Sequence, residues 1–210
     1  FETSLPTIIA DEEGNLKNST QKTMVEIYPK SKDKGCIFEL GIPIVDCDID
    51  YDINVMQKVP LNKDRDNVLP SYRKKLCVEV LNRCYQDLSE DQVKDSWVKE
   101  ALESDDVSSD ATQDVLTKTH GEDAVVFDPT DPEANKKAFA DEKNVIYSNN
   151  YNKNVWSNIR KVRENSGLFK PSGSIGKYAT PKSVGGAEEL SYEKWTDGMK
   201  KVSSYAKRLH

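Results

Sequence analysis

Three stretches with strand character follow one another within the first 60 residues, and the connections between them are too short to hold a helix. They are residues 23–28, which Pro29 closes, residues 36–45 and residues 51–59. Parallel neighbours need a crossover of roughly a dozen or more residues, whereas antiparallel neighbours can be joined by a tight turn. The spacing therefore predicts an antiparallel meander. A Gly-Ile-Pro interruption predicts two short strands or one bent strand over residues 36–45, and residues 1–20 are expected to form a loop or an edge element.

Helical signals dominate the following 60 residues. Apolar side chains recur at helical spacing over residues 71–87, with Ser71 as the expected N-cap. Ser89 is followed three residues later by Gln92, a capping-box pattern that predicts a second helix to about residue 103. A third, shorter helix is expected to start at Ser109 and to end near residue 121.

A strand–helix–strand–helix pattern occupies residues 124–165. Strands are predicted at 124–127 and 144–147, and Asp131 is placed to cap a helix with Pro132 at its first position. A second helix is predicted over residues 152–164. Because a helix connects the two strands, we expect them to pair in parallel. The whole chain is therefore expected to be of the α/β (α+β) class.

The last 45 residues divide into two parts. Residues 166–189 are rich in Gly, Ser, Pro and Lys and are predicted to be a linker. A last helix, capped by Ser191, is predicted over residues 192–209. Three tryptophans are expected to anchor the core: Trp97, Trp156 and Trp195.

Charge and cysteine content exclude several function classes. The 210 residues carry a formal charge of −6, which argues against a general nucleic-acid binder. No apolar run approaches the roughly 18 residues that a membrane span needs, and no signal peptide is visible. Four cysteines without a CxxC pair, and only two histidines, favour buried reduced thiols over zinc or disulfides, so a cytoplasmic protein is expected. The cysteines are Cys36, Cys47, Cys77 and Cys84.

The residues that suggest chemistry lie in a polar loop after the third strand. Lys58, Asn62 and Arg65 fall within this short stretch. A guanidinium on a loop at a strand end suits phosphate recognition, because it is planar, always charged and able to bind in a bidentate way. From spacing alone, Arg65 could equally pair with Asp64 or Asp66 and tie down the loop.

The sequence Pro60-Leu61-Asn62-x-x-Arg65-Asp66 resembles the Pro-Leu-Asn-x-x-Arg-Glu loop in the middle domain of the heat-shock chaperone of the GHKL ATPase superfamily. There the arginine reaches the γ-phosphate in the neighbouring ATPase domain. More widely, the chain resembles large bacterial and phage ATP-binding proteins that begin with a GHKL (histidine-kinase-like) domain. The resembling stretches are residues 25–28, 39–45, 57–72, 97–101, 127–135 and 194–196.

This resemblance implies a domain organisation. Residues 1–88 would form a transducer-like domain with the ribosomal-protein-S5 domain 2 fold, and residues 89–122 a helical connector. Residues 123–165 would form a small βαβα domain, and residues 166–210 a linker and C-terminal helix. A chain that starts without Met and ends inside a helix is expected to be part of a longer protein.

The resemblance also implies a function. Arg65 would sense the γ-phosphate, Asn62 would shape the loop, and Lys58 is the second candidate cation. The nucleotide cofactor, ATP with Mg²⁺, would be bound mainly by an N-terminal GHKL ATPase domain of the same protein, and a homodimer is compatible with the family. The GHKL motifs that bind magnesium, activate water and cover the nucleotide are not in this sequence. We therefore expect the parent protein to be an ATPase. This chain alone is not expected to be catalytic.

Two alternatives of other classes remain open. The chain could be a free-standing protein-interaction module, of phage origin, without a nucleotide role. It could also be a metal-dependent enzyme that uses Asp128, Asp131 and Glu133 after a strand, although Asp131 equally suits a helix cap. Residues 173–177 lack the spacing of a phosphate-binding loop.

Overall fold

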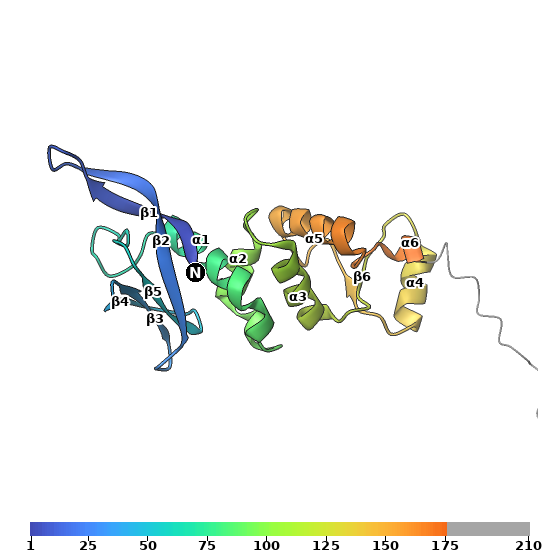
Figure 1. Ribbon diagram of the computed structural model, residues 1–210. Coiled ribbons are helices and arrows are strands. Elements are labelled where there is room, and N and C mark those ends of the chain that lie inside the picture. The colour runs from blue at the N-terminus through green and yellow to red at the C-terminus, as the bar shows by residue number, and fades with distance from the viewer. Residues whose placement is uncertain (176–210) are drawn as a thin grey trace, which may run out of the picture. The chain divides into compact units, whose positions relative to one another are not determined.

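A five-stranded sheet, formed by the first 55 residues, is followed by a series of helices and a two-stranded sheet in a mixed α+β architecture (Figure 1). The structure, a computed structural model, describes residues 1–175. The strands are β1 (Glu2–Ala10), β2 (Leu16–Pro29), β3 (Gly35–Glu39), β4 (Ile42–Cys47), β5 (Tyr51–Val55), β6 (Val125–Val126) and β7 (Val145–Ile146). The helices are α1 (Pro70–Cys84), α2 (Ser96–Leu102), α3 (Ser109–His120), α4 (Pro132–Ala140), α5 (Lys153–Ser166) and α6 (Ser172–Ile175), with 3₁₀ turns η1 (Tyr85–Asp87) and η2 (Gln92–Lys94).

Strands β1 and β2 form a long antiparallel hairpin at the edge of the sheet. Their register runs from Glu2 opposite Met24 to Ala10 opposite Leu16. Only the end of β2, from Val25 onward, pairs with β5. The rest of the hairpin therefore extends past the sheet, at the upper left of Figure 1. The expected edge element is confirmed, and β2 begins well before the predicted residue 23.

The predicted antiparallel meander is wrong. In a meander, strands that follow one another in the sequence would be neighbours, whereas the observed strand order is β1-β2-β5-β3-β4. The segment 36–45 does split into the two strands β3 and β4. Strand β5 then crosses to the far side of β3, where it pairs parallel to β3 and antiparallel to β2. A Cβ atom at Gly35 would lie 2.2 Å from the backbone oxygen of Ile49 and 2.3 Å from that of Tyr51. The crossing chain therefore passes so close to β3 that only glycine fits there.

A buried carboxylate fastens this crossing. Asp52 on β5 accepts hydrogen bonds from the backbone N–H groups of Ser31 and Cys36, both at 3.0 Å. Burial opposes the charge on Asp52, but these hydrogen bonds outweigh it and keep the pKa of the carboxyl below its usual value. The β2–β3 connection and the start of β3 are thereby held to the central strand.

The predicted helix over residues 71–87 is confirmed as α1 followed by η1, but Ser71 is not its cap. The N-cap residue is Leu69, and Pro70 occupies the first helical position. Proline fits there because its fixed φ already matches the helix and the N–H it lacks would have no intrahelical partner. The predicted third strand, over residues 51–59, ends earlier than expected, at Val55.

The capping box forms, but it opens a shorter element than predicted. The backbone N–H of Gln92 donates to Ser89 Oγ at 3.3 Å, and Gln92 Oε1 accepts from the Ser89 N–H at 3.0 Å. The chain makes only the 3₁₀ turn η2 before Asp95 adopts an extended conformation. The α-helix α2 then starts at Ser96.

The second half of the chain follows the predicted pattern closely. Strands β6 and β7 pair in parallel, as expected. Asp131 caps α4, accepting from the Ala134 N–H at 3.0 Å, with Pro132 at the first position. Asn152 caps α5 in the same way.

One cluster of buried side chains runs from Leu5 in the sheet to Phe169 after α5, and residues Phe1–Ile175 form one compact unit. The expected boundaries at residues 88, 122 and 165 all fall inside this unit. Trp97 is fully buried, whereas Trp156 is half-buried and donates to the Ser148 carbonyl at 2.9 Å. Trp195, the last predicted helix and most of the predicted linker lie outside the described residues.

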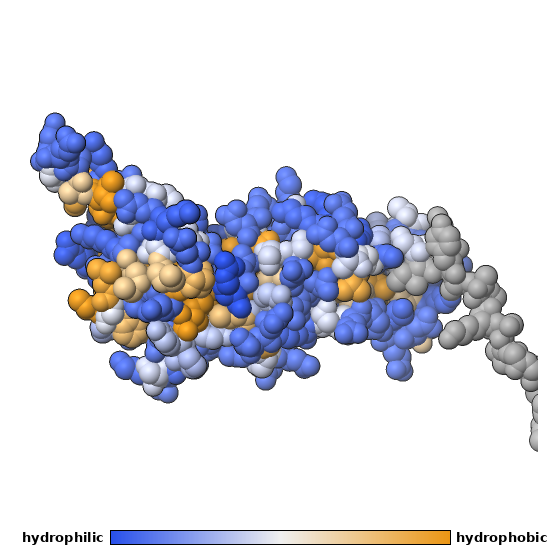
Figure 2. Space-filling view, viewed as in Figure 1, coloured by the Kyte–Doolittle hydropathy of each residue, from blue (hydrophilic) through white to orange (hydrophobic). Residues whose placement is uncertain are grey.

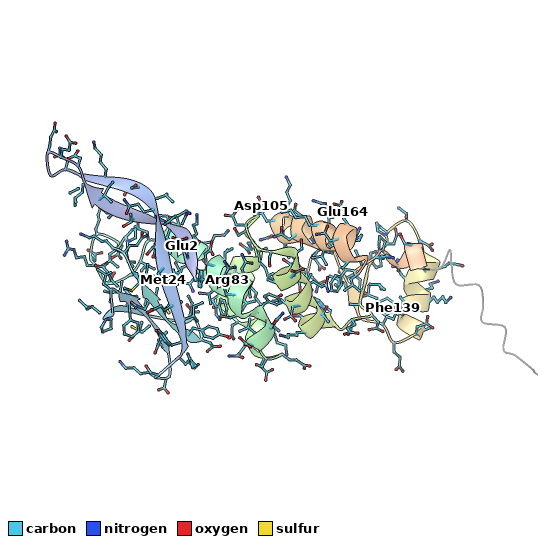
Figure 3. All side chains as sticks on the ribbon, viewed as in Figure 1. Glu2, Met24, Arg83, Asp105, Phe139 and Glu164 are labelled. Atoms are coloured by element: carbon cyan, nitrogen blue, oxygen red, sulfur yellow. The ribbon has the colours of Figure 1, made fainter. Side chains whose placement is uncertain are left out.

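The four cysteines are all free and buried, as the sequence predicted. Burial raises the pKa of the Cys47 thiol to about 11 and that of Cys77 to about 12. The Arg83 guanidinium (labelled in Figure 3) lies 4.8 Å from the ring centre of Phe1, so α1 contacts the residue before β1. None of the helices in residues 1–175 is long and apolar enough to cross a membrane.

Candidate functional site

The loop over residues 60–69, called here the 60–69 loop, is a closed hairpin-like turn. A bridge pairs Leu61 with Val68, and the Leu69 N–H donates to the Pro60 carbonyl at 3.1 Å. Within it, the Asn62 N–H donates to the Asn67 carbonyl at 2.8 Å. Backbone hydrogen bonds at its base thus define where the loop leaves the sheet and where α1 begins.

The side chain of Asn62 organises the tip of this loop. Its Oδ1 accepts from the backbone N–H groups of Asp66 at 3.2 Å and Asn67 at 3.4 Å. Its Nδ2 donates to the Asp66 carboxylate at 2.6 Å. Asparagine suits this position because its short amide can satisfy nearby backbone donors that a turn leaves unpaired.

Arg65 lies at the exposed tip of the loop. Its φ of +58° places it in the left-handed region, and its N–H donates to the Asn62 carbonyl at 3.2 Å. Within residues 1–175, its side chain makes no hydrogen bond or ion pair. The local pairing with Asp64 or Asp66, which the sequence left open, is therefore not formed in the described part of the chain. The guanidinium is available to a ligand without breaking an internal contact.

Lys58 is also exposed but belongs to a different local structure. Its backbone carbonyl accepts a hydrogen bond from Thr7 Oγ1 at 2.7 Å, which joins the end of the sheet to β1. The neighbouring Gln57 donates to the carbonyls of Leu5 and Pro6 at 3.2 and 3.3 Å. No interaction among the described residues joins the Lys58 side chain to Asn62 or Arg65. The structure thus brings Asn62 and Arg65 together and leaves Lys58 on the adjoining segment.

Two of the three acidic residues after β6, Asp128 and Asp131, have structural partners. Asp128 Oδ1 accepts from the N–H and the hydroxyl of Thr130, at 2.9 and 2.6 Å, and Asp131 is the cap of α4. Glu133 is exposed in the first turn of α4. Across residues 1–175, no group of three or more His, Cys, Asp or Glu side chains is placed to hold a metal ion.

A second charged cluster joins the β4–β5 connection to α2. Lys30 Nζ lies 2.7 Å from Asp50, and Arg73 bridges Asp48 and Glu100. Burial and the neighbouring Asp50 carboxylate raise the pKa of Asp95. Arg73 lies on α1 and contacts both Asp48, which follows β4, and Glu100 on α2, so the cluster joins α2 to α1 and to the sheet.

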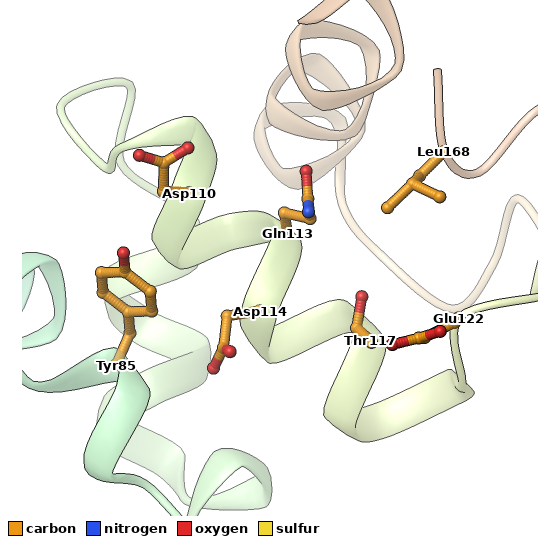
Figure 4. Close-up of a pocket in the computed structure, with 7 residues that line it drawn as sticks. All are labelled: Tyr85, Asp110, Gln113, Asp114, Thr117, Glu122 and Leu168. Atoms are coloured by element: carbon orange, nitrogen blue, oxygen red, sulfur yellow. The ribbon is translucent and has the colours of Figure 1, made fainter. Parts of the chain in front are cut away.

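Sequence reasoning missed a wide pocket beside α3, shown in Figure 4. Its volume is about 560 Å³. Three carboxylates, Asp110, Asp114 and Glu122, share its wall with Tyr85 and Leu168. Asp114 is paired with Lys118 at 2.7 Å. The acidic residues between 100 and 114 are visible in the sequence. The pocket itself could not be predicted from them, because Tyr85 and Leu168 on its walls lie far away in the sequence.

Exposed apolar side chains form a further surface feature. Figure 2 shows hydrophobic surface over the five-stranded sheet, whereas the helices present mainly hydrophilic atoms. Met24 on β2 (labelled in Figure 3) is 47% exposed. The other exposed apolar residues on the strands, turns and ends of this sheet include Tyr28, Leu40, Ile42 and Met56.

Comparison of the chain with protein-family models, with curated proteins and with solved structures finds no match.

Proposed function

We propose that this chain is the coupling part of a larger, cytoplasmic GHKL-type ATPase, in which Arg65 contacts the γ-phosphate of ATP. One observation carries the proposal: Arg65 is exposed at the tip of an internally hydrogen-bonded loop and has no partner within residues 1–175. A buried or ion-paired arginine would first have to give up a stabilising contact before it could bind phosphate.

The chemistry follows from the loop's rigidity. Asn62 holds the loop tip through three side-chain hydrogen bonds, so less conformational entropy is lost when Arg65 docks. A guanidinium can bind two phosphate oxygens at once and stays charged at every physiological pH. Lys58, exposed on the segment before the loop, would add positive charge near the same ligand.

The coupling would be conformational. ATP and Mg²⁺ would be held mainly by an N-terminal GHKL domain of the same protein, and Arg65 would reach that nucleotide from this chain. The five-stranded sheet with α1 would then act as the transducer, with a ribosomal-protein-S5 domain 2-like fold. Hydrolysis would remove the γ-phosphate contact and release the two domains from each other.

The test is ATP turnover by the full-length parent protein with Arg65→Ala. We expect turnover to fall at least about tenfold, or about 1.4 kcal/mol of transition-state stabilisation, while ATP binding survives. The matched control is Lys63→Ala, because Lys63 is an exposed cation in the same loop. It should leave turnover within about twofold of wild type, as most surface substitutions do. Equal turnover in wild type and Arg65→Ala would refute the proposal.

A second candidate function is favoured by the apolar surface of the sheet. In that case the chain is a protein-interaction module that associates with a second copy through residues such as Met24 and Met56. Exposed methionines are adaptable contact residues. Light scattering on the full chain would then show a concentration-dependent mass that Met24→Asp lowers, and Arg65→Ala would be silent in every assay.

A further inference from the structure

Strand β2 has an unpaired edge over residues 16–22, called here the free edge. On one side β2 pairs with β1 along this stretch, whereas β5 on the other side pairs with β2 only over residues 25–29. Within residues 1–175, no other strand or isolated bridge pairs with the free edge. It belongs to the part of the hairpin that extends past the sheet in Figure 1. An unpaired strand edge is a template onto which another strand can add.

The strand register shows which backbone groups point outward along the free edge. Phe1 and Val25 exchange two hydrogen bonds, of 2.9 and 2.8 Å, so the backbone N–H and carbonyl of Val25 face β1. Consecutive residues of a strand direct these groups to opposite sides, so the even-numbered residues of β2 face away from β1. The Met24 carbonyl agrees with this, because it accepts from the Met56 N–H at 3.0 Å on the β5 side. The outward-facing residues of the free edge are therefore Leu16, Asn18, Thr20 and Lys22.

Prolines interrupt the two outermost strands of the sheet but not the free edge. Pro6 of β1 has the parity that faces away from β2, so the N–H it lacks leaves a gap in the outer edge of that strand. The other outermost strand, β4, contains Pro43. Residues 16–22 contain no proline, and all of them except Ser19 are exposed. The free edge therefore keeps a complete row of donors and acceptors.

An antiparallel pairing of two copies would use this row completely. The outward-facing residues are centred on Ser19. A two-fold axis at Ser19 places Asn18 of one copy opposite Thr20 of the other. Leu16, which is 69% exposed, then falls opposite Lys22, whose aliphatic stem can cover it. Each outward-facing residue thereby gives one donor and one acceptor to the second copy.

The end of the free edge fixes this register. Moving the axis one residue toward β5 would set Leu16 against Met24, whose carbonyl is already bound by the Met56 N–H. Moving it one residue toward the hairpin turn would leave Lys22 without a partner strand. Only the axis at Ser19 pairs every outward-facing residue.

The charges on the strand favour a second copy in this direction. In the antiparallel register Lys17 falls opposite Gln21 and Lys22 opposite Leu16, so no lysine faces another. A parallel, in-register pairing would set each lysine against itself, which is destabilising. The two-fold arrangement also consumes the free edge of both copies, so the assembly closes as a dimer.

We propose that the free edge is a dimer interface, at which two copies of this chain join their β1–β2 hairpins into one four-stranded antiparallel sheet. The interface uses neither Arg65 nor a nucleotide, so it goes beyond the ATPase proposal and is tested separately from it. It also differs from the apolar sheet surface around Met24, because main-chain groups rather than apolar side chains carry it.

Light scattering on the full chain over a range of concentrations tests the edge. Thr20→Pro removes an outward-facing N–H from each copy but leaves the bonds between β1 and β2, so the concentration at half-dimerisation should rise at least about tenfold. Ser4→Pro is the matched control. Ser4 is exposed on β1, and its N–H faces the edge that Pro6 already interrupts, so dimerisation should be unchanged. Similar melting temperatures for the two proline variants would show that both fold.

Cysteine crosslinking tests the register. At the two-fold axis, Ser19 faces its counterpart in a non-hydrogen-bonded pair, where the Cα atoms lie about 4.5 Å apart, within reach of a disulfide. Ser19→Cys should therefore crosslink two chains under mild oxidation by oxidised glutathione. Gln21→Cys is the control, because Gln21 faces Lys17 and not its own counterpart. The four native cysteines are buried, so the background should be low.

Four results would overturn the proposal. The wild-type chain could be monomeric at every concentration, which would leave the free edge to a strand of another protein. Thr20→Pro could dimerise as well as wild type, or the two cysteine variants could crosslink equally. Finally, Met24→Asp rather than Thr20→Pro could abolish the dimer, which would assign the interface to the apolar sheet surface.

Discussion

Asn158 on α5 joins the C-terminal end of α2 to the rest of the helical region. Only 2% of the residue is exposed, and its Nδ2 donates to the carbonyls of Leu102 at 3.0 Å and Ser104 at 2.9 Å. Leu102 is the last residue of α2, and the carbonyls at the end of a helix lack intrahelical partners, so this side chain satisfies one of them. It also holds the following turn through the Ser104 carbonyl. We predict that Asn158→Ala is one of the most destabilising polar-to-alanine substitutions in the described chain.

The magnitude follows from the burial of the two bonds. Leaving a buried carbonyl unsatisfied costs about 1–3 kcal/mol, and the bond to Leu102 is fully buried. The bond to Ser104 is partly buried, so water can replace some of it. We therefore expect the free energy of unfolding to fall by about 3 kcal/mol. For a unit of this size, that loss corresponds to a fall in Tm of about 6–12 °C.

Urea denaturation monitored by circular dichroism and tryptophan fluorescence measures the effect. Asn165→Ala is the control, because the exposed Asn165 side chain makes one solvent-exposed hydrogen bond, from its amide to the Ser109 hydroxyl at 3.1 Å. It should change the free energy of unfolding by no more than about 0.5 kcal/mol. A loss below about 1 kcal/mol for Asn158→Ala, or a loss equal to that of the control, would refute the reasoning.

Three further predictions concern the topology, a helix cap and a buried histidine. Gly35→Ala should prevent stable folding, because its Cβ would meet two backbone oxygens at 2.2 and 2.3 Å. Gly14→Ala, whose Cβ would have no atom within 4 Å, should lower the free energy of unfolding by only about 1 kcal/mol. Similar melting curves for the two variants would contradict the argument that β5 crosses close to Gly35. Asp131→Ala should lower the free energy of unfolding by about 1 kcal/mol through loss of the α4 cap, and an unchanged urea midpoint would disprove that role. Burial lowers the pKa of His120, whose Nε2 lies 2.6 Å from Tyr151 Oη, so the unfolded chain binds this proton more readily than the folded chain. Stability should therefore fall as pH drops below about 6.5, and His120→Gln should flatten that slope between pH 7.5 and 5.5 in urea titrations; equal slopes would rule it out.

Local signals in the sequence predicted most of the elements. Asp131 followed by Pro132 marked the start of α4, and the helix-connected strands of residues 124–147 pair in parallel as expected. The Ser89–Gln92 capping box was also identified correctly. It did not reveal that the chain extends again at Asp95, because a capping box specifies only the first turn of a helix.

The sequence likewise predicted one part of the candidate site and missed another. The motif around Asn62 and Arg65 was visible because both lie in one short loop, and their hydrogen bonds span only a few residues. A groove of about 400 Å³ beside Tyr72 could not be predicted from the sequence, since its walls come from β1, β2, the 60–69 loop and the start of α1. The pocket of Figure 4 likewise joins Tyr85 to residues of α3 and to Leu168.

The sequence by itself determined the periodicity, the Asp131 cap, the Ser89–Gln92 capping box and the positions of most strands and helices. These features depend on interactions between residues a few positions apart. Only the tertiary structure decided the strand order. The crossing of β5 depends on Gly35 meeting the backbone of Ile49 and Tyr51 at distances that no other residue would allow. It also depends on Asp52 of the central strand β5, whose carboxylate accepts hydrogen bonds from the backbone N–H groups of Ser31 and Cys36. Such contacts follow from how the whole chain packs, and local sequence patterns do not predict them.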